Sequence, residues 1–237
     1  MMRNAACRAG LRGWRAVVAA ALAAVLPTVP AAPPAEPAAA LAGAQQLQDL
    51  ARRIERRYRE QGAFRASFHQ RYESTTFGAE DEARGTIHVS PPGRILWEYS
   101  QPKGQKAVYD GERWWLLVPE DREVKIKDQV PGLSDPLTDL LAGRIDLLKV
   151  FAVTESSAPP AAKGRVVLEL VPRDVRDDLE MALIEADRAS GDVRRLEIVD
   201  PLGNRLVYDL GAPVAEKPLP ASAFAMKVPA GFNVTRE

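Results

Sequence analysis

The sequence predicts a mainly β protein with a few helices, in which about ten or eleven strands form one strongly curved antiparallel sheet. Three observations predict it. From residue 64 onward, short runs of alternating apolar and polar residues follow one another, separated by Gly, Pro and Asp turn signals. Several of these runs are apolar on both faces. An amphipathic helix precedes the first run and has an apolar face that needs a partner.

The N-terminal segment is typical of a cleavable signal peptide spanning residues 1–31. Arginines but no acidic residue precede the apolar run 16–26, and small residues follow it. The run is about half the length that spans a bilayer, so we expect removal rather than anchoring. VPA at 29–31 is the nearest cleavage site by spacing, and ALA at 40–42 is the second choice. Because the single cysteine, Cys7, precedes the apolar run, we expect a mature chain without disulfides or a lipid-modified cysteine.

The rest of the chain divides into a short lead-in and a single domain. Residues 32–44 are rich in Pro and Ala, and we expect them to be a disordered lead-in. The domain covers 45–237 and begins with a helix expected over 45–61. Apolar residues recur there at helical spacing: Leu47, Leu50, Ala51, Ile54 and Tyr58. The other sides of this helix are rich in arginine, which suits either a solvated face or a contact with anionic lipid.

The strands are expected to follow directly. In the first, Phe64, Ala66 and Phe68 alternate with polar residues, and a polar turn at 77–82 leads to the second. Pro91, Pro92 and Gly93 end the second strand, because proline cannot donate to a β ladder. Two short helices are expected within 133–149, capped by Asp135. Later strands are expected at 94–100, 105–111, 112–118, 122–128, 149–155, 164–172, 179–188, 192–200, 203–210 and 224–234.

The strand ERWWLLV distinguishes a single curved sheet from a two-sheet sandwich. Trp114, Leu116 and Val118 point to one side of it, whereas Trp115 and Leu117 point to the other. Both faces must therefore leave water, one against helices or a second layer and the other toward an interior. A barrel-like sheet of this many strands is wide enough to leave a cavity.

No pattern in the sequence predicts catalysis, a metal or a cofactor. His69 and His88 lack the cysteines or spaced carboxylates of a metal set. Ser100 and Lys103 form S-x-x-K without the companion motifs of acyl enzymes. The acidic clusters at 80–82, 120–123 and 174–180 fall in expected turns. The formal net charge is zero, which does not favour a nucleic-acid partner.

Five segments carry a resemblance to a known family: FRASFHQ, GTIHVSPPGRILWEYSQP, AVYDGERWWLLVPEDREV, DPLTDLLAG and FAMKVPAGFNV. In this order the chain resembles the periplasmic outer-membrane lipoprotein carriers, the LolA family. The resemblance implies an incomplete antiparallel β-barrel, or half-barrel. Its apolar cavity would be covered by the helix 45–61 and by the helices around 135–149.

The resemblance also implies a function and its partners. The protein would be a soluble carrier in the periplasm of a Gram-negative bacterium, without enzymatic activity or a cofactor. It would bind the acyl chains of lipoproteins and ferry them from the inner to the outer membrane. An inner-membrane ABC transporter would be the donor and an outer-membrane lipoprotein receptor the acceptor, and the carrier would be a monomer.

The predicted lipid-binding set has eight residues: Leu50, Ile54, Phe68, Ile87, Val89, Trp97, Tyr99 and Trp115.

Family members commonly carry an arginine immediately before the proline of the segment GTIHVSPPGRILWEYSQP, where it bonds the lid helices. Here that position is Pro91, and Arg94 cannot be assumed to replace the arginine. Two other functions stay open: a periplasmic module of the same fold that senses lipids or lipoproteins, and a carrier of another acylated lipid.

Overall fold

The computed structural model describes residues 36–75, 78, 80–128 and 136–236. The expected signal peptide, its cleavage sites up to residue 31, the start of the expected lead-in at 32–35 and the expected cap Asp135 lie outside the described residues. Residues from Glu36 onward form one unit and are considered by themselves.

The described strands form a single 13-stranded sheet in the order β13-β6-β5-β4-β3-β2-β1-β11-β10-β9-β8-β7, with β12 paired to β1. The expectation of a single sheet, in preference to a two-sheet sandwich, is therefore confirmed. All neighbours are antiparallel except β13 and β6. The bounds are β1 Phe64–Glu73, β2 Glu80–Ser90, β3 Arg94–Gln101, β4 Lys106–Tyr109, β5 Arg113–Val118, β6 Glu123–Asp128, β7 Phe151–Glu155, β8 Arg165–Pro172, β9 Met181–Asp187, β10 Val193–Val199, β11 Arg205–Leu210, β12 Val214–Ala215 and β13 Asn233–Arg236.

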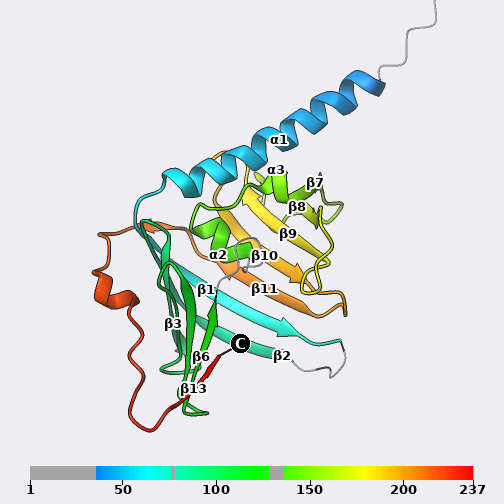
Figure 1. Ribbon diagram of the computed structural model, residues 1–237. Helices are drawn as coiled ribbons and strands as arrows, with labels where there is room; N and C mark the ends of the chain where they lie inside the picture. Colours follow the sequence, from blue (N-terminus) through cyan, green and yellow to red (C-terminus); the bar gives the residue numbers. More distant parts are fainter. Residues whose placement is uncertain (1–35, 76–77, 79, 129–135, 237) are drawn as a thin grey trace, which may run out of the picture. The chain divides into compact units, whose positions relative to one another are not determined.

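Two aromatic rings show how strongly the sheet curls. Trp97 lies on β3 and Tyr208 on β11, and β2 and β1 separate these strands in the sheet. Three strand spacings amount to about 14 Å along a flat sheet. The ring centroids are nevertheless 5.5 Å apart. The strands therefore coil around these side chains, which stand on the concave face, as the unclosed sheet in Figure 1 shows.

Three helices accompany the concave face (Figure 1). They are α1 Glu36–Glu60, α2 Pro136–Leu141 and α3 Leu147–Val150. The two short helices confirm the expectation for 133–149. Helix α1 starts at Glu36, and the expected start at residue 45 is wrong. Alanine, the best helix former, dominates 38–44, and Pro37 falls in the first turn, where its missing N–H costs nothing.

The last expected strand, 224–234, is wrong in most of its length. A 3-10 helix, η1 Ala221–Phe224, occupies its start, and only Asn233–Arg236 is a strand. Pro229 lacks a donor and Gly231 has φ +81°, so the segment between them turns instead of pairing. The chain then returns beside β6, where Asn233 pairs with Glu123 in parallel. The C-terminal end therefore adds an edge strand, β13, that overlaps the expected strand only at residues 233 and 234.

Candidate functional site: the apolar interior beneath the helices

The concave face of the sheet and the inner sides of the helices share one apolar cluster. Alternate positions of β1, β2 and β3 point into it, which confirms the period-two reading of those strands. From α1 it receives Leu50, Ala51, Ile54 and Tyr58, and Ile54 is 0% exposed. The sheet contributes, among others, Phe64, Phe68, Ile87, Val89, Ile95, Trp97, Tyr109, Leu168, Ile184, Leu196, Tyr208 and Leu210.

An aromatic group stands at the centre of this face. Phe68 meets Trp97 edge-on at 4.8 Å and Tyr99 edge-on at 5.1 Å between ring centroids. Phe68 pairs with Gly85 on β2, and Gly85 pairs with Tyr99 on β3. Because Gly85 has no side chain, the rings of Phe68 and Tyr99 touch across it. Edge-to-face contacts of this kind add about 0.5–1.5 kcal/mol beyond burial.

Helix α1 is held over the interior by a few polar contacts with the β9–β10 end of the sheet. The backbone N–H of Val193 donates to the hydroxyl of Tyr58 at 3.0 Å, and Arg57 Nε donates to Asp192 Oδ1 at 2.6 Å. Arg53 donates to the carbonyl of Arg188. A Cβ added to Gly191, which has φ +77°, would stand 3.2 Å from the carbonyl oxygen of Arg53. The absence of a side chain therefore lets the turn lie close to the backbone of α1. Two of the arginines of the basic helix face therefore fasten the helix.

A buried carboxylate fastens α1 to α3. Glu55 is 8% exposed, and its Oε1 accepts the backbone N–H of Leu147 at 2.7 Å. Leu147 is itself buried. The first turn of a helix leaves its N–H groups without intrahelical acceptors, so a side chain from a neighbouring helix can serve as a cap. The helices therefore form a connected cover, with polar bonds from α1 to the β9–β10 turn, from α1 to α3 and from Arg173 to α3.

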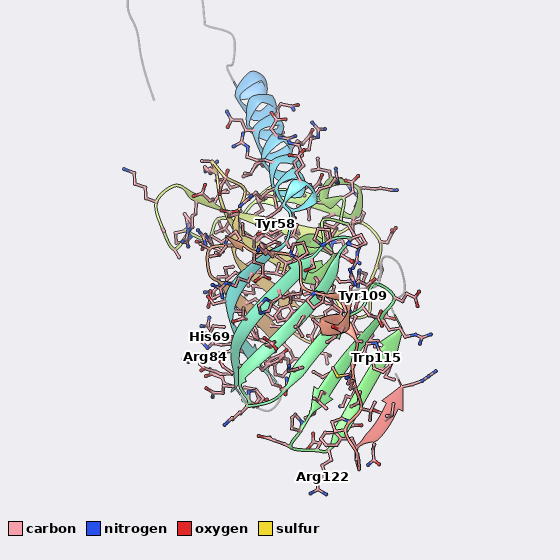
Figure 2. The ribbon with its side chains drawn as sticks, turned by 90° about the vertical axis from the view of Figure 1, so that its left-hand side faces the viewer. Tyr58, His69, Arg84, Tyr109, Trp115 and Arg122 are labelled. Atoms are coloured by element: carbon pink, nitrogen blue, oxygen red, sulfur yellow. The ribbon has the colours of Figure 1, made fainter. Side chains whose placement is uncertain are left out.

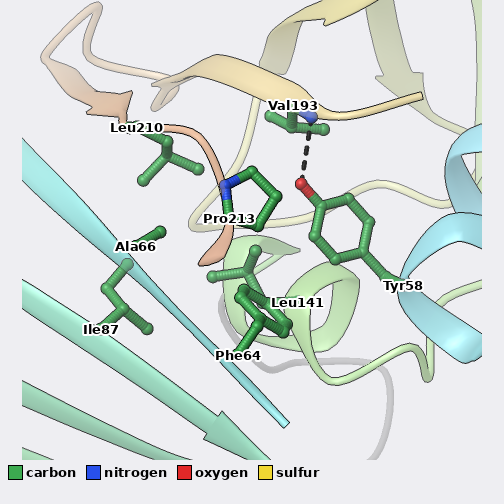
Figure 3. A pocket seen from close by; sticks show the side chains of 9 residues that line it. Tyr58, Phe64, Ala66, Ile87, Leu141, Val193, Leu210 and Pro213 are labelled. Carbon is green, nitrogen blue, oxygen red and sulfur yellow. Dashed lines mark hydrogen bonds between the residues drawn. The ribbon is translucent and has the colours of Figure 1, made fainter. Parts of the chain in front are cut away.

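A small pocket lies between this cover and the sheet (Figure 3). The space amounts to about 240 Å³ only when open solvent at its mouth is included, so the enclosed part is far smaller than the roughly 300–1,000 Å³ typical of ligand sites. In the described arrangement, here termed closed, this pocket is too small for a long apolar ligand, which would enter it only if the helices moved. The lining residues are Tyr58, Phe64, Ala66, Ile87, Leu141, Val193, Leu210, Gly211 and Pro213.

The convex face of β3–β5 carries a second, smaller apolar cluster. Leu96, Val108 and Phe224 form its buried part, with Trp115 packed against them. The C-terminal segment crosses this face, because Leu219 N–H donates to Ser90 Oγ at 3.2 Å and His88 Nδ1 lies 3.0 Å from Glu216 Oε1. Figure 2 shows Trp115 beside this segment, away from Tyr58. The two-sided apolar strand β5 is thus explained by the interior cluster on one face and the C-terminal segment on the other.

The predicted lipid-binding residues separate into two groups. Leu50, Ile54, Phe68, Ile87, Val89, Trp97 and Tyr99 belong to the interior cluster. Trp115 requires a correction, because it lies on the opposite face and its indole N–H donates to Asp110 Oδ2 at 2.8 Å. Sequence reading did not single out the pocket residues Leu141, Val193 and Pro213. Only the fold brings these distant segments together, and Pro213 belongs to an irregular segment with no periodic signal.

The residues weighed for catalysis or metal binding have ordinary surroundings. Ser100 Oγ donates to the carbonyl of Arg84 at 3.1 Å, and His69 Nε2 lies 3.3 Å from Glu82 on the neighbouring strand. Arg84 Nη2 bonds the same carboxylate at 2.9 Å, and these bonds hold the pKa of Glu82 below its ordinary value. Across the described ranges no group of three His, Cys, Asp or Glu side chains could hold a metal ion.

The turn at Pro91 contacts the helical cover through its glycine. The Cβ position of Gly93 lies 3.4 Å from Ala142 and 3.5 Å from Arg144, in the α2–α3 connection. The guanidinium of Arg144 lies over the ring of Tyr109 at 4.4 Å and pairs with Asp139 at 2.9 Å. Arg94 points the other way and lies over Phe224 at 5.1 Å. The cation beside the contact between this turn and the helical cover is therefore Arg144 of the cover, and not Arg94.

Raising the pH is expected to weaken the α1 attachment through Tyr58. Burial raises the pKa of this phenol from 10.0 to about 12. The unfolded chain loses the proton near pH 10 while the folded protein retains it, so stability is full below pH 10 and declines up to about pH 12. The loss is about 2–3 kcal/mol. Chemical denaturation between pH 8 and 12, compared with Tyr58→Phe, checks it, because the variant should lack this part of the decline.

An unclosed antiparallel sheet, coiled around an apolar interior and covered by helices, defines a half-barrel with a helical lid. Residues 59–227 match the family described as "Outer membrane lipoprotein carrier protein LolA". The chain belongs to this family.

Relatives and a solved structure support the family and the fold. The outer-membrane lipoprotein carrier protein of Dechloromonas aromatica (strain RCB) is 28% identical over 173 residues, which are 73% of this chain and 81% of the relative. The protein of the same name from Hahella chejuensis (strain KCTC 2396) is 26% identical over 199 residues, 83% and 89% of the two chains. An uncharacterized conserved protein from Thermus thermophilus shares the fold at 12% identity and a TM-score of 0.50, covering 80% and 98%. Within the described ranges, no helix has the length and apolar character needed to cross a membrane.

Proposed function

We propose that the protein carries the acyl chains of lipoproteins in the interior beneath α1, α2 and α3, through the periplasm from the inner to the outer membrane. The observation that supports this most directly is the continuous apolar concave face under a cover held by few polar bonds. The names of its curated relatives agree with it. The binding set is the seven interior residues of the predicted list, joined by the pocket residues, without Trp115.

The physical need for such a carrier is large. Exposing an acyl chain to water costs about 0.8 kcal/mol per methylene, so a lipoprotein cannot cross an aqueous compartment unaided. Opening the cover exposes the interior side chains unless an acyl chain replaces their lost contacts. Cargo binding and opening are therefore coupled, and the chain is released to an acceptor that binds it better. An inner-membrane ABC transporter as donor and an outer-membrane lipoprotein receptor as acceptor fit this scheme.

Transport can be tested in cells depleted of their own carrier. We expect the full chain, with its N-terminal segment expected to act as a signal peptide, to enter the periplasm as a monomer. It should restore lipoproteins to the outer membrane. Fractionation of the two membranes measures the outcome. Lipoproteins that stay at the inner membrane, although the protein is folded and exported, would rule out the transport role.

Cargo can be tested by isolating the protein from such cells and analysing what it retains. We expect bound lipoprotein with its acyl chains in the interior, detected by mass spectrometry. If a membrane-anchored regulator is captured in place of lipoprotein, the sensing module becomes the better description. A preparation that holds neither, even when the donor transporter is active, contradicts acyl binding.

A further inference from the structure

Trp97 occupies the middle of the concave face. It lies on β3 opposite Ile87 of β2, and Ile87 lines the pocket beneath the cover. Its own side chain is 3% exposed and lies between the rings of Phe68 and Tyr208. Ala66 and Ala107 extend the same cross-strand row on the two sides of this pair. The largest side chain of the row thus has a small neighbour, Ala107, on one side and the pocket residue Ile87 on the other.

The indole N–H of Trp97 is a buried donor that finds no acceptor among the described residues. Most buried polar groups in proteins are hydrogen-bonded, so each exception asks for an explanation. An unpaired N–H also forfeits the hydrogen bond it would make with water in the unfolded chain. Trp115 of the same chain, by contrast, donates its indole N–H to Asp110 Oδ2 at 2.8 Å. The unpaired donor is the one on the concave, apolar face.

Two aromatic rings pack against Trp97 within the described part of the chain. Its ring makes a 69° edge contact with Phe68 and a 58° tilted contact with Tyr208. An N–H directed to a ring face gains much less than an N–H directed to a carbonyl oxygen. In a low-dielectric interior, a carbonyl that reached the indole would therefore displace such a contact.

We propose that the indole N–H of Trp97 donates to the ester or amide carbonyl of an acyl chain that enters the interior. This inference rests on the proposed function and sharpens it, since it makes the carrier selective for acyl groups over plain hydrocarbon. A hydrocarbon chain gains only apolar burial in the site. An acyl ester gains the same burial and also satisfies the donor that the free protein leaves unpaired.

The test compares two probes of matching length, one with an ester group and one without. Methyl palmitate and a hydrocarbon of matching length are offered to the purified full chain, and binding is measured by competition with a fluorescent fatty acid. Infrared spectra of methyl palmitate labelled with carbon-13 at the carbonyl report its hydrogen bond directly. We expect the bound carbonyl stretch to lie at lower frequency than in alkane solvent, and the ester to bind more tightly than the hydrocarbon.

Two variants remove the donor. In Trp97→Phe the ring becomes smaller, whereas benzothienylalanine at position 97 keeps the indole shape and replaces N–H by sulfur. Both should weaken ester binding by roughly threefold to tenfold, in keeping with the net worth of one hydrogen bond. The benzothienyl variant should leave hydrocarbon binding unchanged and return the carbonyl stretch to its alkane position. Trp115→Phe is the matched control, because it removes an indole from the convex face and should leave both affinities unchanged.

The outcomes separate this inference from the proposed function. If wild-type protein binds neither probe, acyl binding itself fails. If it binds ester and hydrocarbon alike, and the benzothienyl variant changes neither the affinity nor the carbonyl stretch, the Trp97 inference is overturned while acyl binding stands. An equal loss in the Trp115→Phe control would also overturn it, since the effect would then not depend on the concave face.

Discussion

Replacing Gly85 by alanine is expected to lower the free energy of unfolding by about 3 kcal/mol or more, at the upper end of what overpacking costs. A Cβ at this position would stand 2.0 Å from the backbone carbonyl oxygen of Glu98 and 2.8 Å from Cε1 of Phe68. No rotamer change relieves a clash with a backbone atom, so β2 and β3 must separate. The aromatic contacts across Gly85 would be lost with them. Urea unfolding followed by far-ultraviolet circular dichroism measures the effect.

Gly62→Ala is the matched control for this experiment. It adds the same methyl group just after α1, where nothing lies within 4 Å of the new Cβ. Its free energy of unfolding should stay within about 0.5 kcal/mol of wild type, as for most surface substitutions. Equal stabilities for the two variants would show that β2 and β3 adapt at Gly85 and that the close approach is not required.

The curved sheet was predictable because its signals are local. Alternation in the segment around Phe64, Ala66 and Phe68 is read directly from the sequence, and the structure buries all three. The prolines at 91 and 92 end β2 by removing backbone donors, which is also a local effect. The role of Gly85 was not predictable, because it depends on the register that sets it between Phe68 and Tyr99. One sequence does not fix such a register.

The error at Trp115 has a specific cause. Alternation along β5 correctly sends Trp114 and Trp115 to opposite faces, but it does not say which face is concave. That assignment depends on the C-terminal segment, whose Phe224 covers the convex side. The sequence reading expected a strand there, and so left the convex face without a cover. With the segment in place, the bulky residues of β5 on that side are structural and have no part in the candidate site.

Removing the carboxylate of Glu55 is expected to open the cover more readily and so to strengthen acyl binding while lowering thermal stability. In Glu55→Ala the backbone N–H of Leu147 loses its acceptor in a buried position, which costs the closed state about 1–3 kcal/mol. In an open state the same N–H can bond to water. If only the open state takes up cargo, its larger population raises the apparent affinity for a fluorescent fatty acid by roughly fivefold to a hundredfold.

Two variants of the same helix show whether this effect comes from the bond to Leu147. Glu55→Gln keeps an oxygen acceptor at that place and should remain close to wild type in both affinity and melting temperature. Glu60→Ala removes an exposed carboxylate at the end of α1 and should change neither. Because loosening a latch and damaging a binding site change affinity in opposite directions, the sign of the result is decisive. Weaker acyl binding in a folded Glu55→Ala protein would mean that the closed cover is part of the binding surface and that the opening scheme is incorrect.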